Sequence, residues 1–308
     1  MKKFVLKLLV FFCAVVVLDQ LCGRVLEILY KNASSSYPAK NLYLINESND
    51  DVIIYGSSRA FRHYNPMSIK EKTNLSVFNA GIPGNGVVYA YGLYKATRNR
   101  HKPKVALVDL FYEYDLRPTH ANARFIDLLK PFYVQSRELQ EYFVQIDPWT
   151  KITMNSMLFR YNSQIFAILK SQRNDGLLEQ YRGFEPLEGS NSLVTEGRTL
   201  LNMDTVVDVG KTAILEEMIR LMKNDGVKVV LLFSPVWHYI ENDVYRNTIA
   251  SIAQKEGVEF WDYLTTDSLS RSDFYDLGHL NREGADRYSR MVGQRLKEKI
   301  LEWQLVEE

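Results

Sequence analysis

The sequence predicts an α/β protein built on a five-stranded parallel sheet with helices on both faces. Three observations support this prediction. From residue 52 onward, short apolar runs alternate with segments of helical periodicity. Polar and glycine residues follow the ends of several apolar runs, as expected where strands open into functional loops. The chain has 308 residues, of which 46% are hydrophobic, which is enough for one large core.

Five apolar runs are the expected strands, and they cover residues 52–55, 76–78, 105–110, 228–233 and 258–261. The expected helices between and after them cover residues 65–72, 87–98, 209–223, 243–255 and 282–303, with Asn281 as the N-cap of the last. Right-handed crossovers between parallel strands bring the carboxyl ends of the strands to one edge. Ser58, Gly81 and Asp109 follow or end predicted strands, so we expect a site at that edge.

The stretch 116–208 interrupts this alternation, with many aromatic residues and patchy helical periodicity. We interpret it as an insertion of helices and loops between the third and fourth strands. It would form a cap over the site or an interaction surface, and packing of its aromatics into a small core of their own is an equally good interpretation.

The N-terminus is typical of a membrane anchor. Lys2 and Lys3 precede Phe4–Leu18, which is apolar except for Lys7. A spanning helix needs about 20 mostly apolar residues, and no small-x-small cleavage site follows. We therefore expect an uncleaved signal anchor over residues 1–23, a stalk over 24–50, and a domain over 51–308 outside the cytoplasm.

Composition excludes several function classes. The 38 basic and 37 acidic residues give a net charge of +1, so nucleic-acid binding is not expected. Cys13 and Cys22 are the only cysteines, and both lie in the apolar N-terminal segment, so the domain can have neither a disulfide nor a cysteine nucleophile. The histidines lack metal-ligand spacing, and the first strand has no glycine fingerprint for a dinucleotide. We expect no metal and no cofactor.

Two short motifs carry the functional prediction. Gly56-Ser57-Ser58-Arg59 follows the first strand, and Asp276-Leu277-Gly278-His279 precedes the last helix. A serine hydroxyl becomes nucleophilic when an imidazole takes its proton and a carboxylate orients that imidazole. Ser58, His279 and Asp276 could fill these roles, although Ser58 could also be an ordinary turn serine and Ser57 is an adjacent competitor. Arg59 could bind an anionic substrate group or form a surface ion pair.

A glycine-rich loop, Asn79–Gly86, follows the second strand. Glycines let backbone N–H groups approach a ligand closely, and such donors stabilise the oxyanion of acyl transfer. The N–H groups of Gly81 and Ser58 are the expected donors. The alternative is simply a tight loop that leads into the helix at Val87.

Together, Gly56-Ser57-Ser58, Asn79-Ala80-Gly81 and Asp276-Leu277-Gly278-His279 resemble blocks I, II and V of the SGNH (GDSL-like) hydrolase superfamily. The resemblance implies a flavodoxin-like three-layer sandwich. The Gly-Ser-Ser-Arg variant is similar to membrane-anchored bacterial branches that act in O-acetylation of surface glycans and D-alanyl transfer to teichoic acids. The family's third block usually supplies an asparagine to the oxyanion hole. The matching stretch here, 109–115, has none, so Asn85 or the Tyr112 hydroxyl would have to substitute.

The expected function is that of an extracytoplasmic serine esterase or O-acyltransferase, acting through an acyl-enzyme on acyl groups of a cell-surface carbohydrate. The expected location is a bacterial inner membrane, with the domain on the periplasmic or extracellular face and envelope polysaccharide machinery as a partner. The alternative is a catalytically inactive scaffold or glycan-binding protein with the same fold.

Overall fold

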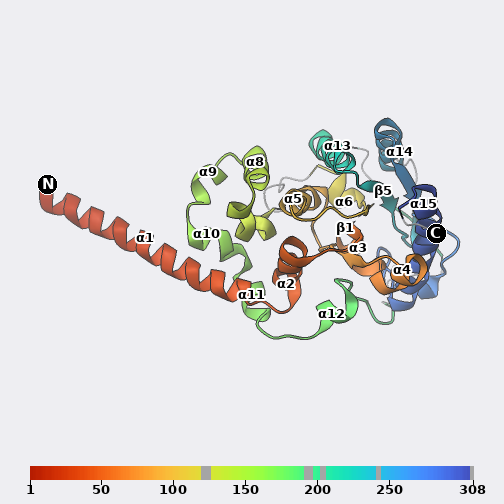
Figure 1. The fold of residues 1–308 in the computed structure, drawn as a ribbon, viewed down its shortest axis with the longest axis horizontal. Coiled ribbons are helices and arrows are strands. Elements are labelled where there is room, and N and C mark those ends of the chain that lie inside the picture. The colour runs from red at the N-terminus through yellow and green to blue at the C-terminus, as the bar shows by residue number, and fades with distance from the viewer. Residues whose placement is uncertain (119–125, 191–196, 202–205, 241–243, 306–308) are drawn as a thin grey trace.

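The computed structural model describes residues 1–118, 126–190, 197–201, 206–240 and 244–305 (Figure 1). Five strands form an all-parallel sheet in the order β2-β1-β3-β5-β7. Their bounds are β1 Val52–Gly56, β2 Val77–Asn79, β3 Val105–Asp109, β5 Lys228–Phe233 and β7 Glu259–Asp262. All five strands predicted from the apolar runs are therefore confirmed, with each boundary within one residue.

Helices cover both faces of the sheet, because alternate residues of the central strands are buried on opposite sides. One core joins Ile53 and Val108 to the helices α5 (Val87–Thr97), α13 (Val209–Asn224) and α14 (Val244–Glu256). The other joins Ile54 and Leu107 to α3 (Ser58–His63), α4 (Pro66–Thr73) and α15 (Arg282–Glu302). Central strands that are apolar on both faces fit a buried parallel sheet, and the predicted three-layer architecture is confirmed.

The predicted N-cap of the last helix is also present. The side-chain oxygen of Asn281 accepts a hydrogen bond from the backbone N–H of Gly284 at 2.9 Å, as an N-cap residue does. A second, two-stranded parallel sheet was not expected from the sequence. It pairs β4 (Thr199–Leu201) with β6 (His238–Ile240).

The insertion is mostly helical in its described part, and its aromatics belong to the main core. Phe132, Leu139 and Phe143 are buried in the same cluster as α5, and the Tyr142 hydroxyl donates to the Val88 carbonyl at 2.8 Å. The helix α6, Tyr112–Asp115, directly precedes the insertion. The helical elements within it are a 3₁₀ segment Asp127–Gln135, α8 Arg137–Ile146, α9 Thr150–Thr153, α10 Met157–Tyr161, a 3₁₀ turn Asn162–Gln164, α11 Ile165–Lys170 and α12 Leu177–Tyr181. These aromatics therefore extend the sandwich core rather than form a separate one.

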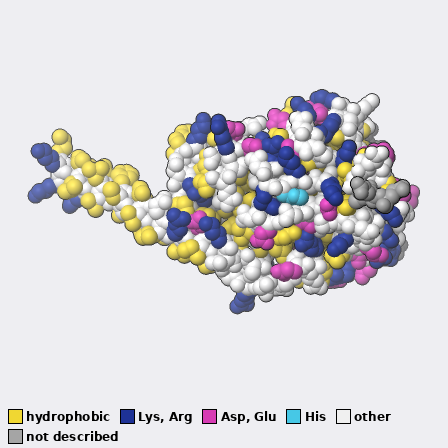
Figure 2. All heavy atoms as spheres, in the orientation of Figure 1, with side chains coloured by type: hydrophobic (Ala, Val, Ile, Leu, Met, Phe, Trp, Pro, Cys, Tyr) yellow, Lys and Arg dark blue, Asp and Glu magenta, His cyan; other side chains and the backbone are white. Residues whose placement is uncertain are grey.

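The first helix, α1 (Lys2–Lys31), is the only one in the described part of the chain that is long and apolar enough to cross a membrane. Its N-terminal part projects from the body, covered with hydrophobic side chains and carrying basic ones at its tip (Figures 1 and 2). This is consistent with a signal anchor or a signal sequence.

The segment that follows the apolar part of α1 differs from the predicted stalk. Helix α2 (Ser36–Leu42) and the π-helical turn Tyr43–Glu47 pack onto the domain, with Lys40, Asn41 and Leu44 buried. The Asn41 amide oxygen accepts a hydrogen bond from the Tyr89 hydroxyl of α5 at 2.5 Å. Residues 24–50 are thus mostly part of the folded body, because their buried side chains find partners on remote elements.

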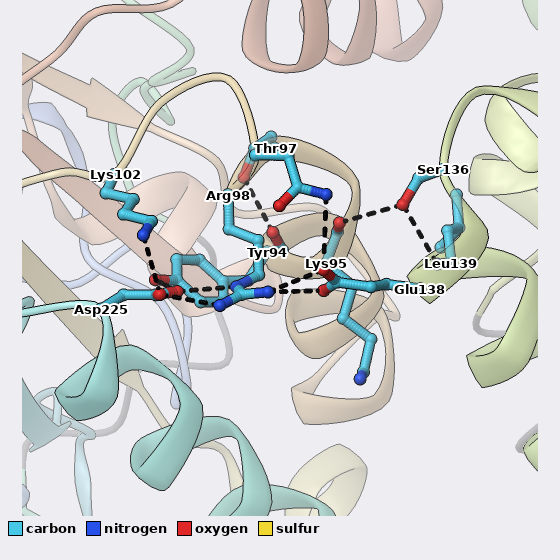
Figure 3. A network of polar contacts seen from close by, with 10 residues as sticks. Tyr94, Lys95, Thr97, Arg98, Lys102, Ser136, Glu138, Leu139 and Asp225 are labelled. Carbon is cyan, nitrogen blue, oxygen red and sulfur yellow. Dashed lines mark hydrogen bonds and ion pairs between the residues drawn. The ribbon is translucent and has the colours of Figure 1, made fainter.

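A polar network joins α5, α8 and α13 at the amino edge of the sheet (Figure 3). Arg98, which follows α5, donates from Nε and Nη2 to Asp225 and from Nη1 to both oxygens of Glu138, all at 2.7 to 2.8 Å. Asp225 also receives the Tyr94 hydroxyl at 2.7 Å and pairs with Lys102 at 2.9 Å. This network fastens the insertion to the sandwich.

Candidate active site

Ser58 stands at the first position of α3, directly after β1. Gly56 makes the turn with φ of +145°, a conformation that side chains disfavour, and a Cβ there would lie 2.4 Å from the Asp109 carbonyl oxygen. The chain must therefore have glycine at this point to pass so close to β3. As a result, the Ser58 hydroxyl is presented at the carboxyl edge of the sheet.

The loop before α15 is shaped by the side chain of Asp276. Its Oδ1 accepts hydrogen bonds from the backbone N–H groups of Gly278 and His279, both at 2.8 Å. The Tyr275 N–H donates to the His279 carbonyl at 2.9 Å and closes the turn. An aspartate that binds the backbone two and three residues ahead is a common local turn, so this part of the geometry is encoded within four residues.

The three residues predicted as a triad lie together. His279 Nε2 is 3.0 Å from Ser58 Oγ, and His279 Nδ1 is 3.0 and 3.1 Å from the two oxygens of Asp276. The serine and the histidine are 221 residues apart in the chain. The side chains of His279 and Asp276 are 27% and 28% exposed, so the group opens to solvent. These distances permit proton transfer from the hydroxyl to the imidazole.

Electrostatics keep the carboxylate of this group charged. Partial burial raises the pKa of Asp276, but the hydrogen bond and charge of His279 and the two backbone N–H donors outweigh it, and the net pKa is lowered. We assign the imidazole proton to Nδ1, facing the carboxylate. This leaves the Nε2 lone pair directed at the Ser58 hydroxyl.

A second histidine, His63 at the end of α3, binds the loop that carries His279. It is fully buried, and its Nε2 accepts the backbone N–H of Leu280 at 3.1 Å. Its ring meets that of His279 edge-on, with the centroids 6.1 Å apart. Burial, the charge of a protonated His279 and the charge of Arg59 lower the pKa of His63 well below its usual range. It is therefore a neutral acceptor that holds the chain next to His279.

Arg59 differs from the prediction that it binds substrate or forms a surface ion pair. Its side chain is fully buried. Its guanidinium donates to the carbonyls of Leu110 and Ser234, which follow β3 and β5, and lies 4.5 Å from the Phe111 ring centroid. Because α3 turns this side chain inward, Arg59 forms part of the floor of the site and is not available to a substrate group.

Asp109 at the end of β3 is another buried part of this floor. Its Oδ1 accepts the Tyr64 hydroxyl at 2.7 Å and the Ser234 backbone N–H at 3.0 Å, and the Tyr288 hydroxyl lies 3.0 Å from that of Tyr64. Burial raises the pKa of the Asp109 carboxyl. This chain of hydroxyls links β3 to α15, the helix that follows the His279 loop.

Within the glycine-rich loop, the two groups predicted as oxyanion donors already donate hydrogen bonds. The Gly81 N–H donates to Asn79 Oδ1 at 2.9 Å, and the Asn85 side chain donates to the Pro83 carbonyl at 3.2 Å. The backbone N–H of Ser58 is the remaining expected oxyanion donor. Because Ser58 is at the start of α3, this N–H has no acceptor within the helix. The oxyanion predictions for Gly81 and Asn85 would therefore require these hydrogen bonds to rearrange or be shared.

Lys40 of α2 braces the same loop and was not anticipated from the sequence. Its buried Nζ donates to the carbonyls of Gly81 and Gly183 at 2.6 and 2.9 Å and lies 4.7 Å from the Phe61 ring centroid. Burial lowers the pKa of Lys40 well below its usual range. Nothing in the sequence neighbourhood of Lys40 marks it, and His63 was missed as well because the helix that carries it, α3, was not predicted.

No protein-family model matches the chain, and no curated protein matches it either. The site is therefore argued from its geometry and its motifs alone.

Proposed function

We propose that this protein is a membrane-anchored serine esterase or O-acyltransferase that works through an acyl-enzyme. The observation that carries the proposal is the contact series from Ser58 Oγ to His279 Nε2 and from His279 Nδ1 to Asp276, all within 3.1 Å. Hydrogen bonds in this order, from hydroxyl to imidazole to carboxylate, are the arrangement that activates a serine.

In the proposed reaction, Ser58 Oγ attacks the acyl carbonyl carbon while its proton passes to His279 Nε2. Asp276 stabilises the imidazolium, and the Ser58 N–H stabilises the oxyanion. The departing alcohol takes the proton from Nε2 and leaves the acyl group on Ser58. Water then releases the acyl group as an acid in a hydrolase, or a sugar hydroxyl accepts it in a transferase.

The proposed substrate is an acyl ester of a cell-surface carbohydrate, outside the cytoplasm. Two observations support this choice. The triad is partly open to solvent, which suits a polymer, and α1 begins with Lys2 and Lys3, which favour retention on the cytoplasmic side. The resemblance to membrane-anchored SGNH proteins agrees with both.

The alternative is a non-catalytic scaffold or glycan-binding protein of the same fold. The engaged Gly81 N–H and the absence of an asparagine from 109–115 favour it, because both weaken the oxyanion hole. Under this alternative, the serine would be unreactive although correctly placed.

The test uses the full chain in detergent, with p-nitrophenyl acetate and a fluorophosphonate probe. We expect turnover and labelling in the wild type, and loss of both in Ser58→Ala and His279→Ala. Loss of labelling only in Ser57→Ala would contradict the assignment of the nucleophile. A folded wild type with neither turnover nor labelling would favour the scaffold. Release of acetate from an O-acetylated polysaccharide, with and without an acceptor sugar, then separates hydrolase from transferase.

A further inference from the structure

Exposed apolar side chains concentrate in the insertion. Apart from Met1 and α1, ten large hydrophobic side chains are exposed in the described part of the chain, and six of them lie within residues 134–177. Phe166 and Leu169 on α11 form one closely spaced pair. Another is Trp149, the N-cap of the single turn α9, and Ile152 within that turn; these two are 69% and 64% exposed. Their spacing of three residues puts them on one side of that turn.

This turn lies on the side of the body from which α1 projects (Figure 1), and the next helix along the chain, α10 (Met157–Tyr161), is held against α1 by direct contacts. The Asp19 carboxylate of α1 accepts hydrogen bonds from the Ser156 hydroxyl and, at 3.0 Å, from the Met157 N–H at the start of α10. Gly23 lies against Met157 so closely that a Cβ would come within 2.4 Å of its backbone. Only a few residues separate α9 from Ser156, so α9 lies near the level of Asp19.

The length of the apolar segment places the edge of a bilayer near the same level. Phe4–Leu18 spans about 22 Å as a helix, whereas the hydrocarbon core of a bilayer is about 30 Å thick. A span that begins at Phe4 therefore reaches the far interface only in the next few residues, at Asp19 to Gly23. That is the part of α1 to which α10 is docked.

We propose that α9 is a second, interfacial membrane contact, with Trp149 and Ile152 inserted among the lipid headgroups of the leaflet that α1 leaves. Tryptophan prefers this zone because its ring is apolar and its N–H is polar. Lys151, exposed between them, can reach lipid phosphates with its ammonium group. Together with the docked α1, this contact fixes how the triad edge faces the bilayer. The inference rests on the proposed function only in that α1 spans the membrane.

The test places the full chain in phospholipid nanodiscs and measures tryptophan fluorescence with and without lipids brominated near the headgroup. We expect bromolipid to quench a component in the wild type that is missing from Trp149→Phe. The matched control is Leu301→Trp in the Trp149→Phe background, since Leu301 is 54% exposed on α15 at the other end of the body. This control should show no added quenching.

A fluorophore attached to Cys13 in a Cys22→Ser variant reports separately whether α1 is inserted. An inserted Cys13 with equal quenching in the wild type and in Trp149→Phe would overturn the interfacial contact alone. A water-exposed Cys13 would overturn both the span and the contact. Quenching of Leu301→Trp equal to that of Trp149 would also overturn the proposal, because the signal would then be unspecific.

Discussion

The triad and the Arg98 network are two acid–base clusters at opposite edges of the same sheet, and they differ in how fully their polar groups are satisfied. Arg98 Nε, Nη1 and Nη2 all meet carboxylate oxygens, and the Asp225 side chain is only 5% exposed. In the triad, by contrast, His279 Nε2 faces only the neutral hydroxyl of Ser58, and the group is partly open to solvent. A cluster in which every charged group has charged partners stabilises the fold. A cluster in which an imidazole nitrogen faces only a neutral hydroxyl can transfer a proton.

The pKa of the carboxylate is lowered in both clusters. Burial raises the pKa of Asp225, but the hydrogen bonds from Arg98, Tyr94 and Lys102 lower it by more. The pKa of Asp225 is therefore far below its usual range. Asp225 therefore cannot exchange a proton near neutral pH. The same substitution made in both clusters tests whether they have different roles.

The largest expected effect is on catalysis by Asp276→Asn. If the proposed function holds, the amide favours the wrong imidazole tautomer, and kcat for p-nitrophenyl acetate should fall by about 10⁴-fold. The control is Asp225→Asn in the other cluster, which should leave kcat of the folded protein within about twofold. A comparable loss of kcat in Asp225→Asn would contradict the division of roles.

The next effect is on stability, from Arg98→Met. Removing this guanidinium leaves the largely buried Asp225 without its main partner, so the free energy of unfolding should fall by about 2 to 3 kcal/mol. Arg137→Met is the matched control, because the Arg137–Glu141 pair is 89% and 65% exposed and should be worth less than about 0.5 kcal/mol. Urea unfolding measures both, and equal losses would show that burial of the network does not matter.

A smaller expected effect concerns pH, because the stability contributions of His63 and Asp225 change over different pH ranges. His63 has a lowered pKa in the folded protein, so below about pH 6.5 the unfolded chain binds a proton that the folded one does not. This site then destabilises the fold by up to about 1.4 kcal/mol per pH unit as pH falls from 6.5 toward 5.

The measurement compares urea unfolding of the wild type and His63→Gln at several pH values. The stability of the wild type relative to the variant should decline over this window. Asp225, whose folded pKa is lowered, contributes stability that is lost only below about pH 4, where its unfolded form begins to protonate. A constant difference between pH 7 and 5 for His63→Gln would show that folding does not lower the pKa of His63.

The smallest expected effect comes from Ser57→Ala. The Ser57 hydroxyl is fully buried, and no hydrogen-bond partner is found for it among the described residues. Its removal should change kcat by less than about twofold and stability by less than about 1 kcal/mol, because no hydrogen bond is lost. Kinetics and thermal melting check this. A large loss of kcat with an unchanged melting temperature would indicate that Ser57 is the nucleophile and would contradict the assignment of Ser58.

Features that depend only on neighbouring residues could be predicted from the sequence. Strand positions follow from continuous apolar runs such as 228–233, the turn at Gly56 from glycine's freedom at positive φ, and the N-cap from Asn281. The contact of Asp276 with His279 is equally local, since the carboxylate binds backbone and side chain within four residues. Such features need no knowledge of the rest of the fold.

Contacts between residues far apart in the chain depend on tertiary packing and could not be predicted from local patterns. This packing brought Ser58 to His279, buried Arg59 beneath the site, engaged the Gly81 N–H with Asn79, and docked Lys40 under the glycine-rich loop. Local patterns set where a helix or strand forms. The direction of one side chain and the partner it finds depend on how elements distant in sequence pack together, because a buried polar group must take its hydrogen bonds from whatever the assembled core presents.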